Sequence, residues 1–263
     1  MSENPVTCTV EGGIARIALH RPDKGNAFDK PMADALLDAA LACSSDDAIR
    51  CIVLSGSGTM FCVGGDVSAF AQNGANISGF LAELAGVLHL AMAQFAAMRK
   101  PLVTLVNGPA AGAGMSIAIS GDLVLAARSA HFTAAYGAIG LTPDGGMTWT
   151  LPRLIGIRKA QELLITNRRV GAEEAAAIGL VTKVVDDDRL TIEGDELATK
   201  LASGAVEAMA GARILLHESA TTGFVSQMDR EARSIAAAGR GPEGREGVTA
   251  FLQRRKPDFT KNR

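Results

Sequence analysis

Apolar residues along the chain follow two kinds of spacing. Short continuous apolar runs are typical of strands buried on both faces, and they lie at 6–10, 14–19, 51–54, 102–106, 123–127, 131–133 and within 179–185. Apolar residues three or four positions apart predict helices, at 30–42, 80–98, 113–120, 148–154, 159–165, 172–177, 189–203, 205–221, 224–238 and 245–255. The order of strands and helices between 51 and 127 predicts parallel strands joined by crossover helices.

This order of elements predicts an α/β fold with a helical appendage. We place the α/β core at residues 1–195 and the helical region at 196–263. The chain of 263 residues is long enough to bury one sizeable core. No stretch of altered composition marks a linker between the two parts.

Two turns built from small residues each follow a predicted strand. Residues 110–114 contain nothing larger than a methyl group and precede a predicted helix, while Gly64-Gly65 follows the strand at 51–54. Small side chains let a ligand oxygen approach the backbone N–H groups, as an oxyanion hole requires. An ordinary turn between a strand and a helix explains the same residues. A phosphate-binding loop does not fit, because GxGxxG is absent from both turns and GxxxxGK[ST] from the whole chain.

Composition excludes several function classes. Aromatic residues make up 4% of the chain and its net charge is −2, so neither stacking nor a basic field favours nucleic acid. The four cysteines form no CxxC pair and the four histidines are isolated, so we expect no metal. We see no signal pattern and no apolar run of membrane-spanning length. We therefore expect a cytoplasmic protein that binds neither nucleic acid nor membrane.

Four polar residues are candidates for chemistry, and each has an ordinary structural explanation. Asp144 lies in a Pro-Asp-Gly sequence, which is a routine turn. Ser116 lies in half of a GxSxG motif whose closing glycine is missing. His89 falls among apolar residues of a long helix, which favours a core or groove histidine over a base. Tyr136, the only tyrosine, opens a glycine-rich loop and is explained by packing.

Several motifs in order resemble the crotonase superfamily, also called the enoyl-CoA hydratase/isomerase family. They are Asn26-Ala27-Phe28, residues 61–66, residues 106–114, residues 151–156 and residues 245–252. The resemblance implies a spiral of ββα units with a C-terminal helical region that trimerises, often into a dimer of trimers. It also implies acyl-CoA thioester substrates, with coenzyme A arriving as part of the substrate and no tightly bound cofactor.

The resemblance also implies positions for the site. The two oxyanion-hole amides fall on Gly65 and Ala113. The remaining positions implied for substrate and coenzyme A are Pro22, Asp23, Lys24, Ala27, Phe61, Gly64, Asp66, Gly112, Tyr136, Phe251 and Arg254. The last two resemble residues that hold the nucleotide end, frequently from a neighbouring subunit.

The acid/base positions distinguish reactions within this family. Hydratases carry two glutamates at positions that match Ser116 and Tyr136, whereas isomerase-like members place one carboxylate at the position of Asp144. The context of Asp144 is similar to ring-epoxide isomerases of phenylacetyl-CoA breakdown and to enoyl-CoA isomerases. The resemblance thus favours an isomerase with Asp144 as base.

Three alternatives stay open. They are an enoyl-CoA hydratase, a dehalogenase or hydrolase of the same fold, and a non-catalytic acyl-CoA-binding member. The halide-displacing relative uses an aspartate at the position of Asp144, with a histidine where His89 stands and a tryptophan where Tyr136 stands.

Overall fold

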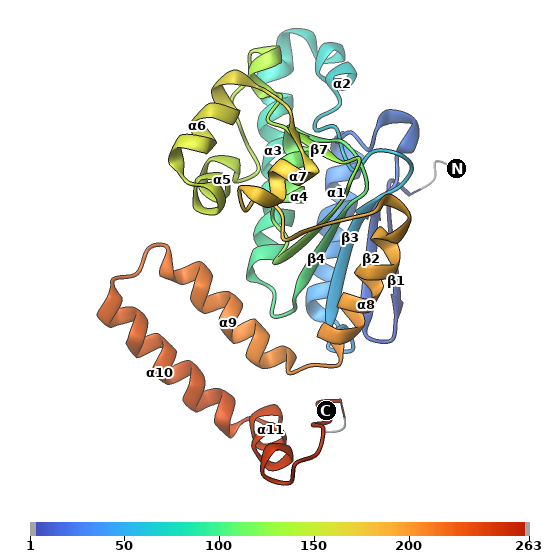
Figure 1. Cartoon of the computed structure of the whole chain (residues 1–263). Helices are drawn as coiled ribbons and strands as arrows, with labels where there is room; N and C mark the ends of the chain where they lie inside the picture. The colour runs from blue at the N-terminus through green and yellow to red at the C-terminus, as the bar shows by residue number, and fades with distance from the viewer. Residues whose placement is uncertain (1–3, 261–263) are drawn as a thin grey trace.

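The computed structural model describes residues 4–260, in which a six-stranded sheet forms the centre of the core (Figure 1). Its strand order is β1-β2-β3-β4-β6-β9, and all neighbours are parallel except the β1–β2 hairpin. The strands are β1 (Val6–Glu11), β2 (Ile14–Leu19), β3 (Cys51–Gly56), β4 (Leu102–Val106), β6 (Leu123–Ala127) and β9 (Lys183–Val185). A smaller sheet, β5-β7-β8, consists of β5 (Ala110–Ala111), β7 (His131–Thr133) and β8 (Val170–Gly171).

The helices of the core connect these strands. They are α1 (Lys30–Ser45), α2 (Val67–Gln72), α3 (Ile77–Ala97), α4 (Ala113–Ala118), α5 (Met147–Ile155), α6 (Ile157–Thr166), α7 (Ala172–Ala177) and α8 (Leu190–Ala202). The C-terminal helices are α9 (Val206–Ser219), α10 (Phe224–Arg240) and α11 (Pro242–Leu252). The predicted α/β order and crossovers are confirmed. The sequence did not predict α2, β5 or β8. The strands β5 and β8 are two residues long, which is too short for periodicity to show.

Helix α3 is a core helix despite its apolar composition. Leu84, Leu88, Ala91 and Phe95 form a buried stripe at helical spacing, and α3 packs against α1. The helical segment Gly74–Ala97 is nevertheless 24 residues long and apolar enough, by length and composition alone, to cross a membrane. The prediction that no apolar segment reaches that length is therefore wrong. Within this chain, only 22% of the most apolar window of that segment is buried, which corresponds to the stripe facing the core.

Helix α8 belongs to the core, so the predicted boundary between 195 and 196 falls inside an element. The helix packs across β2, β3, β4 and β6, and Gly194 lies against Leu105 of β4. Asp195 also forms a 2.8 Å ion pair with Arg16 on β2. The structure thus places the start of the helical extension after Ala202.

The helices α9, α10 and α11 extend away from the core (Figure 1). Arg213 helps to attach α9 to it, donating to Asp122 and to the carbonyl groups of Phe95, Ala96 and Met98 at the end of α3. Helix α10 buries no residue, and α11 buries only Ala250. Both helices therefore carry apolar side chains that this chain alone leaves uncovered.

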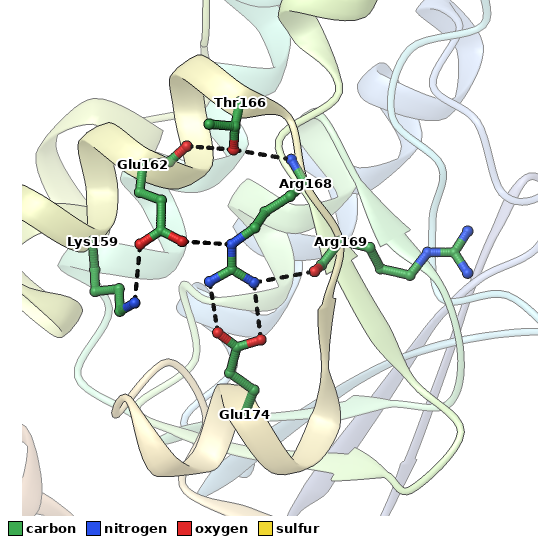
Figure 2. Close-up of polar contacts among 6 residues, drawn as sticks. All are labelled: Lys159, Glu162, Thr166, Arg168, Arg169 and Glu174. Carbon is green, nitrogen blue, oxygen red and sulfur yellow. Dashed lines mark hydrogen bonds and ion pairs between the residues drawn. The ribbon is translucent and has the colours of Figure 1, made fainter.

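A second arginine joins α6 to α7, two helices further along the chain than the glycine-rich loop and α5. Arg168 donates two hydrogen bonds to Glu174, at 2.6 and 2.9 Å, and one of 2.7 Å to Glu162 (Figure 2). Lys159 pairs with the same Glu162 at 2.9 Å. The hydrogen bonds that Arg168 donates to Glu174 and Glu162 raise its pKa. This network fixes the connection between α6 and α7.

Candidate active site

Two turns lie in direct backbone contact at the ends of the adjacent parallel strands β3 and β4. The N–H of Ala111 donates to the carbonyl of Cys62 at 2.9 Å, and Phe61 and Cys62 both donate to the carbonyl of Pro109. A Cβ atom on Gly114 would lie 2.1 Å from the oxygen of Cys62, so no side chain fits there. The predicted small-residue turns therefore meet.

The two amides implied as the oxyanion hole are left without a protein partner. Within residues 4–260, neither the N–H of Gly65 nor that of Ala113 donates a hydrogen bond to the protein. Ala113 is the first residue of α4, and Gly112 before it has φ +52° and ψ −128°, a conformation suited to glycine. The ring of Phe70 packs against Gly65, where a Cβ would lie 2.3 Å from it. Both N–H groups are therefore available to a ligand oxygen.

Asn26 fastens a third loop to these turns. It is fully buried with φ +56°, and its Nδ2 donates to the carbonyl groups of Ser57, Met60 and Phe61. Its Oδ1 accepts from the N–H of Arg21 at 2.8 Å. The buried amide thus holds the loop at 21–28 against the chain that enters the first turn.

Arg21 and Asp66 form the polar edge of the same region. Arg21 donates to the carbonyl of Ala27 at 2.6 Å and pairs with Asp66 at 3.2 Å. Burial alone would raise the pKa of Asp66, but hydrogen bonds from Arg21 and from the N–H groups of Ala69 and Ser68 outweigh it and lower that pKa. Asp66 also caps α2 through these N–H groups. Its carboxylate is therefore already engaged within the protein.

The residues implied for coenzyme A separate into three groups. Pro22, Asp23 and Lys24 form an exposed 3-10 turn at 22–24 beside the buried Ala27. Phe61, in contrast, is wholly buried, and its side chain supports the turn from within the core. Phe251 and Arg254 are exposed at the α11 end, opposite α2 (Figure 1). One chain does not bring these two residues to the turns.

Asp144 is held by the two residues at the other implied acid/base positions. Tyr136 donates its phenol proton to Asp144 Oδ1 at 2.7 Å, and Ser116 donates to the Asp144 carbonyl at 3.0 Å. The Ser116 and Tyr136 oxygens are 3.1 Å apart. Burial, followed by the charge of Asp144, raises the pKa of Tyr136, which therefore stays a proton donor. Within residues 4–260, no donor reaches Oδ2 of Asp144 at hydrogen-bond distance.

His89 is a neighbour of Asp144 that sequence analysis did not assign to the site. Its Nε2 accepts from the N–H of Gly145 at 3.0 Å and lies 4.0 Å from Asp144 Oδ2. The side chain is about half exposed, so of the two predicted positions, core or groove, the structure favours the groove. The sequence did contain a signal: the buried stripe of α3 follows 84, 88, 91 and 95, and position 89 lies off it.

The donors of this arrangement are backbone amides and a carboxylate, without a metal centre among the described residues. In the part of the chain that the structure describes, no group of three or more His, Cys, Asp and Glu side chains is placed to hold a metal ion. What the site does offer is two unpartnered backbone N–H groups and one carboxylate with an open oxygen. That combination can stabilise a negative oxygen while moving a proton.

Comparisons with known proteins agree with this chemistry. The model of the enoyl-CoA hydratase/isomerase family matches residues 9–262. The chain is 35% identical to 1,2-epoxyphenylacetyl-CoA isomerase of Escherichia coli, covering 95% of this chain and 96% of that protein. It is 38% identical to a protein of Rhodobacter capsulatus named "probable enoyl-CoA hydratase", covering 99% of both.

The fold agrees as well. The crystal structure of an enoyl-CoA hydratase from Polaromonas sp. JS666 superposes with a TM-score of 0.92 at 31% identity, covering 96% of this chain and 98% of that one. The crotonase-like α/β fold expected from the motifs is thereby confirmed. The relatives carry the names of both isomerases and hydratases, so the names alone leave the reaction open.

We predict that Asn26→Asp destabilises the protein by at least about 3 kcal/mol in urea unfolding. The change keeps shape and the Oδ1 acceptor, but it places a carboxylate oxygen opposite three carbonyl groups. Asn107→Asp is the matched control, because Asn107 Nδ2 donates only to Gly58 at an exposed position. There we expect a loss of about 1 kcal/mol or less. Equal losses would contradict the role given to Asn26.

Proposed function

We propose that this chain, which belongs to the enoyl-CoA hydratase/isomerase family, isomerises an acyl-CoA thioester with Asp144 as the only base. The reaction class is a double-bond shift or a ring-epoxide isomerisation through an enolate. Coenzyme A enters as part of the substrate, and the proposal involves no tightly bound cofactor.

The observation that carries this proposal is the asymmetry of the Asp144 carboxylate. Oδ1 accepts a hydrogen bond from the Tyr136 hydroxyl, while Oδ2 is left without a donor in the described residues. Oδ2 is therefore the oxygen that takes a proton from one substrate carbon and returns it to another. The electron pair released from the C–H bond moves into the thioester, whose carbonyl oxygen becomes negative.

Gly65 and Ala113 supply the donors for that oxygen. Their N–H groups have no protein acceptor in residues 4–260, and the turns that carry them are fixed by backbone contact. Donors held in place before the reaction stabilise the developing charge without reorganisation. This supports an enolate intermediate shared by the double-bond shift and the ring-epoxide isomerisation.

Hydration is disfavoured by the residues beside Asp144. Ser116 and Tyr136 occupy the positions at which the resemblance implies two glutamates, and both bond to Asp144 itself. A hydroxyl and a protonated phenol do not remove a proton from water at neutral pH. One carboxylate suffices for proton transfer within the substrate, whereas water addition needs a second activating group.

We also propose that the chain assembles as a homotrimer or a dimer of trimers through its C-terminal helices. Large apolar side chains of α10 and α11 are about three-quarters or more exposed, namely Phe224, Val225, Ile235, Phe251 and Leu252. An accumulation of large exposed apolar side chains on two neighbouring helices supports an interaction site there. In such an assembly Phe251 and Arg254 reach the coenzyme A site of a neighbouring subunit.

We predict that Asp144→Asn lowers isomerisation of a 3-enoyl-CoA, or of an aromatic ring-epoxide CoA ester, by about 100-fold or more. The amide keeps the shape but does not accept the proton. The measurement is kcat/KM on a panel of 2-enoyl, 3-enoyl and aromatic CoA esters, each assayed for isomerisation, hydration and hydrolysis. We expect isomerisation by the parent to exceed crotonyl-CoA hydration.

The panel also separates the alternatives. Efficient hydration that survives Asp144→Asn would refute the proposal and require another base. Release of halide from a halogenated aryl-CoA would favour the displacement reaction instead. CoA binding that persists with no turnover of any substrate, unchanged by Asp144→Asn, would identify a non-catalytic member.

We predict that Ala113→Pro lowers turnover by about 100-fold or more while the fold is retained. Proline has no N–H to donate, yet it is favoured at the first position of a helix, which Ala113 occupies in α4. Circular dichroism and oligomer size are the controls. Turnover within about tenfold of the parent would exclude Ala113 as an oxyanion donor.

We predict that Phe251→Ser weakens CoA binding about tenfold, because the ring is 83% exposed in one chain and is used only in the assembly. Gln253→Ser, at a neighbouring exposed residue outside the apolar set, is the control. Isothermal titration with CoA gives the dissociation constants, and sedimentation gives the oligomer size. Parental affinity in both variants would show that position 251 is ordinary helix surface.

A further inference from the structure

A large apolar hollow lies directly behind the acid/base residues. It has a volume of about 830 Å³ and is bounded by α3, the connection at 119–123, α5 and α9. Its rim includes His89, Gly145 and Gly146, whereas the side chain of Asp144 does not line it. The volume falls in the range of roughly 300–1,000 Å³ that is typical of small-molecule sites.

One hydrogen bond joins two of the lining residues beside Asp144. The N–H of Gly145 donates to His89 Nε2 at 3.0 Å and thereby bridges the glycine-rich loop to α3. Gly145 has φ +60°, and a Cβ there would lie 2.9 Å from Ser116 and 3.3 Å from the sulfur of Met92. The loop is thus packed closely on α3 and α4, and His89 is a half-exposed side chain that lines the hollow.

The lining of the hollow suits an uncharged, apolar group. Its side chains include Met92, Ile119, Leu154 and Leu216. The guanidinium of Arg213 also lines it, but that group donates to Asp122 and to three backbone carbonyls. The charge of Arg213 is therefore compensated, and a second carboxylate on the ligand has no free partner there.

We infer that the hollow is a binding site for the distal end of a long or bulky apolar acyl group, which passes His89 to enter it. This inference rests on the proposed function. A substrate carbon that exchanges a proton with Asp144 Oδ2 lies next to His89, because the two side chains are 4.0 Å apart. Acyl carbons further along the chain then continue past the rim. Rotation of His89 breaks one neutral hydrogen bond, and burial of methylene groups in the hollow compensates for it.

The only tryptophan of the chain provides a direct probe. Trp149 lines the hollow, stacks on His217 with ring centroids 4.8 Å apart, and lies under the guanidinium of Arg153. An acyl tail in the hollow changes the surroundings of this ring. Its fluorescence therefore reports occupancy of the hollow without any catalytic step.

The experiment titrates the intact protein with free CoA, butanoyl-CoA and dodecanoyl-CoA, which are saturated and do not isomerise. Calorimetry gives the dissociation constants, and Trp149 emission is recorded in parallel. We expect all three to bind, dodecanoyl-CoA at least tenfold more tightly than butanoyl-CoA, and only dodecanoyl-CoA to shift the emission to shorter wavelength.

Two matched variants on α3 complete the test. Ala93 is exposed and lines the hollow, so Ala93→Phe fills it; Ala82 is exposed on the same helix and is not among the residues lining the hollow. We expect Ala93→Phe to remove the chain-length preference and the emission shift while butanoyl-CoA binding is retained. Ala82→Phe should retain the chain-length preference, the emission shift and the binding of butanoyl-CoA.

Each contrary result has a distinct meaning. Binding of all ligands with no chain-length effect on affinity or emission overturns the hollow as an acyl site and leaves the proposed function intact. Emission that depends on protein concentration and not on ligand shows that a second copy of the chain fills the hollow, which also overturns it. Failure of every CoA compound to bind refutes the proposed function and this inference together.

Discussion

The close approach of two backbone turns is the constraint on which the site depends. Gly114 and Gly64 lie where added Cβ atoms would be 2.1 Å from the oxygen of Cys62 and 2.9 Å from that of Ala111. Parallel pairing of β3 with β4 brings both turns to one edge of the sheet, because parallel strands end on the same side. With side chains excluded, the N–H groups of Gly65 and Ala113 face no protein acceptor in residues 4–260.

The regular core was readable from the sequence because its signals are local. The continuous apolar runs at Leu102–Val106 and Leu123–Ala127 match β4 and β6 at both ends, since both strands are covered on each face. Asp29 stands directly before α1, where aspartate is a preferred cap, and it accepts from the N–H of Met32. The sequence predicts the start of α3 at residue 80, whereas the helix begins at Ile77. The prediction is late because Gly79 reads as a break although it lies within the helix.

Contacts between distant segments were not readable in this way. Asp144 in its Pro-Asp-Gly turn looks routine until Tyr136 and Ser116 are seen to bond to it. Asn26 carries no pattern that reveals three carbonyl partners more than thirty residues away. The resemblance to a family supplied the roles that periodicity did not, and it also included Phe61, whose burial only the fold reveals.

Helix α4 relates the two halves of the proposed chemistry. Its first residue, Ala113, carries one oxyanion N–H, and Ser116, three residues later, holds the carbonyl of Asp144. At 1.5 Å rise per residue, these positions are separated by about 4.5 Å along the helix axis. A rigid helical turn therefore fixes how far the base stands from the charge that it creates. Ser116 positions Asp144 in this arrangement through its hydrogen bond to the Asp144 carbonyl. A larger side chain at 116 would therefore move Asp144 as well as change the local chemistry.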